Sequence, residues 1–182
     1  MQSAQWFCHF FVAELHLERN SLTCTDRFPI IAEKEAWVVN MVQLQAIYDT
    51  YVQTLAKVYR EARPTDGLFG WGDDPRKDPC HMHFYEQTEQ WIGAFLASGP
   101  EQEAVFAAVR FILTFPAEHR EEPCFWFAYA AHGLTRDLIS RLSTAQCGEL
   151  WTFYEANYPK QERMPAQTEI AKLLKKRAGR RF

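Results

Sequence analysis

The chain has 182 residues with a net charge of -3, and 47% of its residues are apolar, including 14 Phe, 7 Tyr and 6 Trp. This composition excludes a disordered protein, because disordered chains lack the apolar surface that offsets the entropy lost on ordering. A chain of this length buries about 70% of the surface that its unfolded form exposes, so we expect one domain, residues 1–182, with an aromatic core.

The cysteines and the apolar runs indicate the compartment. The five cysteines form no C-x-x-C pair and are odd in number, which argues against a disulfide framework. The apolar N-terminal stretch has no basic flank of the kind that precedes a signal sequence. The apolar run 104–115 contains Arg110 and is too short to span a bilayer. We therefore expect a cytoplasmic protein without a membrane partner.

The first 28 residues are ambiguous. The run from Trp6 to Val12 is apolar at nearly every position, so its period does not separate a buried helix from a buried strand. We favour a helix for residues 3–18 and keep the strand as the alternative.

A long helix is predicted over residues 33–62. Its apolar residues recur at alternating steps of four and three, which places them on one helical stripe: Trp37, Met41, Leu44, Tyr48, Tyr51, Leu55 and Val58. About 30 residues at 1.5 Å each give a helix of about 45 Å. We expect it to form the centre of the domain and to end before Pro64, since proline disfavours helical geometry at the preceding residue.

Residues 64–80 are predicted to form an irregular loop, because three glycines and three prolines interrupt any regular period. Loops of this length inside a compact domain are uncommon unless they carry function. We therefore take this loop as the candidate partner-binding surface. Its candidate contact residues are Trp71, Asp73, Asp74, Arg76 and Asp78.

Helical patterns fill the rest of the chain. We expect helices over 81–97 and 101–115, with a break at Pro116, and a short aromatic helix over 124–132 that Gly133 closes in the left-handed conformation. Thr135 is expected to cap the next helix, and Ser143 with Gln146 forms a capping box that opens another. A final helix over 165–177 precedes a basic tail, residues 178–182. The fold class is therefore an all-α bundle of six to eight helices.

The segment 73–83 holds the residue types that bind metals, namely carboxylates, one thiol and two imidazoles. His81 and His83 are two residues apart, however, so on a helix they point to different sides. Cys80 and His83 remain weak candidate ligands, and we assign no metal site and no cofactor. Asp78 is more simply explained as a helix cap.

Charge is unevenly distributed. Six cations lie within residues 172–181, which leaves 14 cations against 23 anions, or -9, for the remaining body. An acidic body favours a basic protein partner over nucleic acid, and cations at the end of a helix offset its macrodipole. Nucleic-acid binding through the basic tail remains an alternative that would need a recognition motif, which is absent.

No nucleophile elbow and no phosphate-binding glycine loop occurs in the sequence. We therefore expect a non-enzymatic protein-binding module, for instance a bacterial immunity protein that neutralises a toxin. A metal-dependent or hydrolytic enzyme that uses the 73–83 segment is the alternative. The sequence indicates neither the partner's identity nor the oligomeric state.

Overall fold

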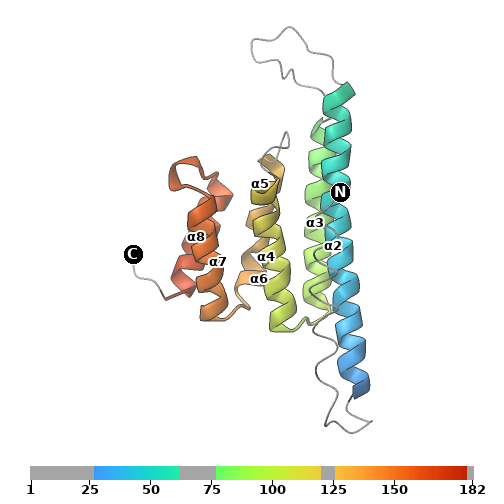
Figure 1. Ribbon diagram of the computed structural model, residues 1–182, viewed down its shortest axis with the longest axis vertical. Coiled ribbons are helices and arrows are strands. Elements are labelled where there is room, and N and C mark those ends of the chain that lie inside the picture. Colours follow the sequence, from blue (N-terminus) through green and yellow to red (C-terminus); the bar gives the residue numbers. More distant parts are fainter. Residues whose placement is uncertain (1–26, 62–76, 120–125, 180–182) are drawn as a thin grey trace. The chain divides into compact units, whose positions relative to one another are not determined.

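The computed structural model describes residues 27–61, 77–119 and 126–179 (Figure 1). The chain forms two compact units, residues 1–36 and 37–182, and the core described below belongs to the second. Every regular element of the described residues is a helix, which confirms the prediction of an all-α fold. The prediction of one domain spanning 1–182 stays a prediction, and the helix favoured for residues 3–18 lies outside the described residues.

The long helix is α2, Arg27–Glu61, with 35 residues. It starts six residues before the predicted position, with Pro29 in its first turn. Proline is tolerated there because the first N–H groups of a helix have no partner within it. The predicted stripe is buried from its third member onward, at Leu44, Tyr48, Tyr51, Leu55 and Val58. The central position expected for this helix stays a prediction.

Helix α3, Lys77–Ala97, runs beside α2. It begins four residues earlier than predicted, so the last part of the expected 64–80 loop is helical. Pro79 falls in the first turn, where its missing N–H costs nothing. The Tyr51 ring stacks on Phe84 at 4.1 Å, and the Trp91 indole N–H donates to the Asn40 carbonyl at 3.0 Å. These contacts tie the two helices together over several turns.

Helix α4, Gln102–Glu118, has buried residues around more than half of its circumference. Tyr48 from α2 sets its ring edge-on against Phe111 and Phe115 of α4, at 5.0 and 4.9 Å. The predicted break at Pro116 is wrong, since the helix continues to Glu118. Pro116 removes a single N–H near the helix end, and the His119 ring bonds the Phe115 carbonyl at 2.8 Å.

Two expectations fail in the next segment, which comprises α5 (Trp126–Ala131), the 3-10 helix η1 (His132–Thr135) and α6 (Arg136–Ile139). Gly133 does not adopt a left-handed conformation, unlike Gly99. A Cβ at Gly133 would lie 3.4 Å from the Cβ of Ala166, so this glycine allows α8 to approach. Thr135 caps nothing with its side chain; its hydroxyl donates to the His132 carbonyl at 2.7 Å.

The C-terminal part follows the prediction closely. Helix α7, Thr144–Asn157, starts with the expected capping box between Ser143 and Gln146. A 3-10 turn, η2 (Lys160–Glu162), leads to α8, Pro165–Arg177, whose bounds match the predicted helix. Helices α7 and α8 pack against each other (Figure 1). Across the described residues, we find no helix with the length and apolarity needed to cross a membrane.

Candidate functional site

Most of the predicted contact surface falls outside the described residues. Trp71, Asp73, Asp74 and Arg76 precede α3 and belong to the range that the structure leaves out. Asp78 lies in the first turn of α3, although the direction of its side chain is outside the description. The proposal that these five residues bind a partner therefore stays a prediction.

The cysteine and the two histidines at the start of α3 are separated by the fold. His81 is 7% exposed, and its Nδ1 lies 2.8 Å from the Tyr51 hydroxyl. His83 is exposed and Cys80 half-buried, and both line a groove between α2 and α3. The prediction that His81 and His83 point to different sides is therefore confirmed.

The groove has a volume of about 420 Å³. The buried rings of Tyr51 and Phe84 contribute to its lining. The other lining residues are Ile47, Thr50, Thr54, Pro79, Cys80, His83 and Gln87. None of these side chains is an Asp, Glu, Lys or Arg, in a chain of which 24% of the residues are charged. The groove therefore offers apolar contact and uncharged hydrogen-bonding groups.

The uncharged surface continues beyond the groove. On α2, exposed Gln43 lies four residues before Ile47, one helical turn away on the same side. On α3, exposed Gln90 and Ala94 continue the side that carries His83 and Gln87. We call the strip from Gln43 to Thr54 on α2, together with Pro79, His83 and Gln87 on α3, the uncharged seam; exposed Glu86 borders it on α3. On α2 it extends about 17 Å, or about three helical turns.

The described residues of the groove do not form a metal centre. Among the described residues no group of three His, Cys, Asp or Glu side chains is placed to hold an ion. Cys80 and His83 are the two candidate ligand types that line the groove. Protein zinc sites use three or four protein ligands, so this pair falls short of a site.

A second set of polar groups lies in the core. His132 is fully buried, and its Nδ1 lies 2.9 Å from the Tyr154 hydroxyl. Burial lowers the pKa of His132 to about 3 and, together with the neighbouring Tyr158, raises that of Tyr154. The Tyr158 hydroxyl donates to the Leu113 carbonyl at 2.6 Å, which joins the end of α7 to α4. These groups are packed among aromatic rings and are not placed on a surface.

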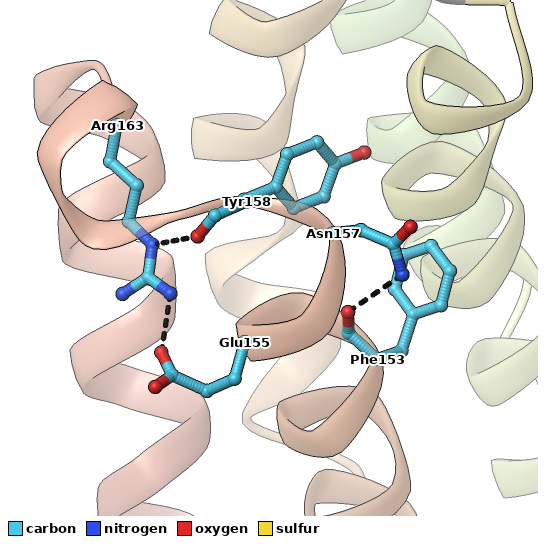
Figure 2. Close-up of polar contacts among 5 residues, drawn as sticks. All are labelled: Phe153, Glu155, Asn157, Tyr158 and Arg163. Carbon is cyan, nitrogen blue, oxygen red and sulfur yellow. Dashed lines mark hydrogen bonds and ion pairs between the residues drawn. The ribbon is translucent and has the colours of Figure 1, made fainter.

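Arg163 fixes the turn that follows α7. Its Nε donates to the Tyr158 carbonyl at 2.8 Å, and its guanidinium also pairs with Glu155 (Figure 2). In the same view the Tyr158 ring points away from Arg163, and the Asn157 amide donates to the Phe153 carbonyl at 3.0 Å. The ends of α7 are therefore held by specific polar contacts, which is typical of a structural role.

The basic end of α8 is partly used by the fold. The Arg177 guanidinium donates to the Leu142 carbonyl at 3.0 Å, and the Lys175 ammonium lies 5.9 Å from the centre of the Trp151 ring. Lys172 and Lys176 are exposed. The three cations of the last turn also face the negative end of the helix dipole. The tail from Arg180 onward lies outside the described residues, so nucleic-acid binding there stays a prediction.

No family model, no curated protein and no solved structure matches this chain. The groove is therefore interpreted from its own chemistry.

Sequence reasoning placed the site in the loop and missed the helical groove beside it. A signal was present, because Gln43, Ile47, Thr50 and Thr54 recur at helical spacing without a charge between Gln43 and Thr54 on that side of the helix. A solvated side of a helix normally carries charged residues, so an uncharged exposed stripe next to the buried one indicates a second contact surface.

Proposed function

We propose that this chain is a non-enzymatic protein-binding module that receives a helix of its partner along the uncharged seam between α2 and α3. The observation that carries this proposal is the groove of about 420 Å³ whose lining contains no ionisable carboxylate, ammonium or guanidinium. Covering such a surface removes no charge from water, and desolvation of a charge is the largest cost that a contact of this kind can incur.

The chemistry of the groove suits a helix as the ligand. Helix-in-groove recognition uses apolar anchors that recur every third or fourth residue. Ile47 and the rings of Tyr51 and Phe84 supply the apolar contact, while Thr50, Thr54 and Gln87 supply uncharged hydrogen-bonding groups. The seam extends about three turns along α2, which is enough for a partner helix to place three or four anchors.

An immunity protein is the instance that the charge of the chain favours. The body outside residues 172–181 carries 14 cations against 23 anions, so a toxin domain with a basic surface would be attracted by long-range electrostatics. On this proposal the groove provides short-range contact and the net negative charge of the chain outside residues 172–181 provides steering. Rising salt then slows association more than it changes dissociation.

The test uses two lysine substitutions on the same helix. Thr50→Lys places an ammonium in the groove, whereas Gln53→Lys places one on an exposed position of α2 outside it. Both positions are exposed, so we expect both variants to fold with wild-type stability. Tagged wild-type and variant chains are used to capture proteins from the native host, and each recovered protein is quantified.

We expect a partner that wild type and Gln53→Lys recover equally and that Thr50→Lys recovers at least about tenfold less, since burying an unpaired charge costs more than 1.4 kcal/mol. Gln87→Lys, from the α3 side of the groove, should repeat the loss. A partner retained by both groove variants, or no partner recovered with any chain, would contradict the proposal.

A further inference from the structure

His132 is enclosed by aromatic side chains. It lies in η1 with no exposed surface, and its Nδ1 is 2.9 Å from the Tyr154 hydroxyl. The ring centres of Tyr129, Tyr154 and Tyr158 lie 6.0, 5.7 and 5.3 Å from the imidazole. Its Nε2 is buried and has no hydrogen-bond partner among the described residues. Among the described residues, the imidazole is thus hydrogen-bonded through Nδ1 and not through Nε2.

No carboxylate of the described residues is placed to balance a charge on this ring. Besides α7, which contributes Tyr154 and is followed directly by Tyr158, η1 packs against α3, α4, α5, α6 and α8. On α4 to α8 every described Asp and Glu is exposed, as are Glu86 and Glu89 on α3. The titratable groups that face the imidazole are the three tyrosines, Tyr129 from α5 and Tyr154 and Tyr158 from α7.

One cation contacts a ring of this cluster. Arg163 lies 5.6 Å from the centre of the Tyr154 ring and is paired with exposed Glu155. Lys175 and Arg177, the half-buried cations of α8, contact the Trp151 ring and the Leu142 carbonyl. A positive imidazole would therefore gain no ion pair from the described residues.

We propose that His132 is an acid-sensitive latch, in which protonation of the imidazole opens the packing of η1 against α7. In the neutral ring a single N–H is present and the Tyr154 hydroxyl bonds one nitrogen. Protonation turns both nitrogens into donors, so Nε2–H becomes a charged donor without an acceptor in an apolar site. Opening the contact between η1 and α7 hydrates the imidazolium, so protonation favours the open state.

The direction of the pH response follows from where the proton binds. Burial lowers the pKa of His132 from 6.5 to about 3 in the folded chain, so the unfolded chain binds this proton first. The stabilisation is complete above about pH 6.5 and is lost progressively as the pH falls towards 3. Each pH unit in that interval raises the unfolding equilibrium constant about tenfold through this one group.

The test compares urea unfolding of the full chain at about pH 7.5 and about pH 5. His132→Gln keeps a hydrogen-bonding side chain but cannot take up the proton, and His83→Gln, which removes an exposed imidazole, is the matched control. Between the two pH values we expect the unfolding constant of wild type and of His83→Gln to rise about 30-fold more than that of His132→Gln. An equal rise in all three chains would overturn the proposal.

A measurement on the wild-type chain covers the case in which His132→Gln does not fold. The carbon-bound ring protons of His132 are followed by NMR while the pH is lowered from about 8 to about 5 in the folded protein. We expect their chemical shifts to stay constant until unfolded signals appear. A His132 signal that titrates within the folded state shows that the charged ring is accommodated, and the latch is then wrong.

Discussion

Two buried tyrosines offer a matched test of how the core is held together. Tyr158 donates its hydroxyl to the Leu113 carbonyl at 2.6 Å, whereas the Tyr48 hydroxyl is buried without a hydrogen-bond partner among the described residues. Both side chains are at least 95% buried, and both are packed against aromatic rings. Replacing each tyrosine by Phe removes a hydroxyl that is hydrogen-bonded at position 158 and one that has no partner among the described residues at position 48.

The expected changes have opposite signs. Tyr158→Phe removes a buried hydrogen bond, which costs about 1 kcal/mol of unfolding free energy because the Leu113 carbonyl of α4 loses the hydroxyl donor at the end of α7. Tyr48→Phe removes a hydroxyl whose unpaired burial costs about 1 to 3 kcal/mol, so we expect a gain of about 1 kcal/mol. In Tyr48→Phe the ring remains, so its edge-on contacts with Phe84, Phe111 and Phe115 are kept.

Urea unfolding of wild type and the two variants measures both changes in one experiment, and about 1 kcal/mol corresponds to a melting shift of about 2 to 4 °C in a chain of this size. A Tyr48→Phe variant that loses as much stability as Tyr158→Phe would refute the reasoning. The Tyr48 hydroxyl would then have a hydrogen-bond partner in solution, such as a water molecule buried in the core.

Three further experiments test local features. Gly93→Ala, at an exposed position of α3, should stabilise by about 0.5 to 1 kcal/mol. Gly99→Ala should destabilise by about 1 kcal/mol because Gly99 has φ of 69°. Similar effects of the two substitutions in thermal melts would contradict this. Ser143→Ala should lose about 1 kcal/mol in urea unfolding through loss of the capping box, and an unchanged midpoint would show that the cap is dispensable. Elemental analysis of the purified chain should find no stoichiometric zinc, because Cys80 and His83 supply two ligands in the groove; one zinc per chain that His83→Ala removes would favour the enzymatic alternative.

The features that sequence reasoning predicted correctly depend on neighbouring residues. The buried stripe from Leu44 to Val58 follows from helical spacing, and the box between Ser143 and Gln146 follows from two side chains that are three residues apart. Both signals are complete within a few turns of one helix. Contacts with other segments therefore have little influence on these two features.

The features that were missed depend on contacts between distant segments. Gly133 resembles a helix terminator in sequence, but its lack of a side chain allows Ala166 of α8 to approach. Pro116 resembles a break, but α4 continues past it for two residues to Glu118. His81 resembles a metal ligand in the sequence, but in the structure its Nδ1 is hydrogen-bonded to the hydroxyl of Tyr51, which lies 30 residues earlier.

The candidate site divides in the same way. The uncharged stripe on α2 is visible in the sequence, yet its meaning depends on the side of α3 that lies beside it. Periodicity identifies which residues share a side of one helix and does not identify the neighbouring helix. The loop residues Trp71, Asp73, Asp74, Arg76 and Asp78 therefore stay a prediction, while the groove rests on the geometry of Ile47, Thr50 and their neighbours.

Site-specific photo-crosslinking tests the central claim most directly. A benzophenone amino acid replaces Thr50 in the groove or Gln53 outside it, and the chain is irradiated in the cells that produce it. We expect a discrete covalent adduct with another protein from position 50 and none from position 53, since the partner helix lies along the uncharged seam. Adducts from position 53 alone, the same adducts from both positions, or none from either would contradict a partner-binding groove between α2 and α3.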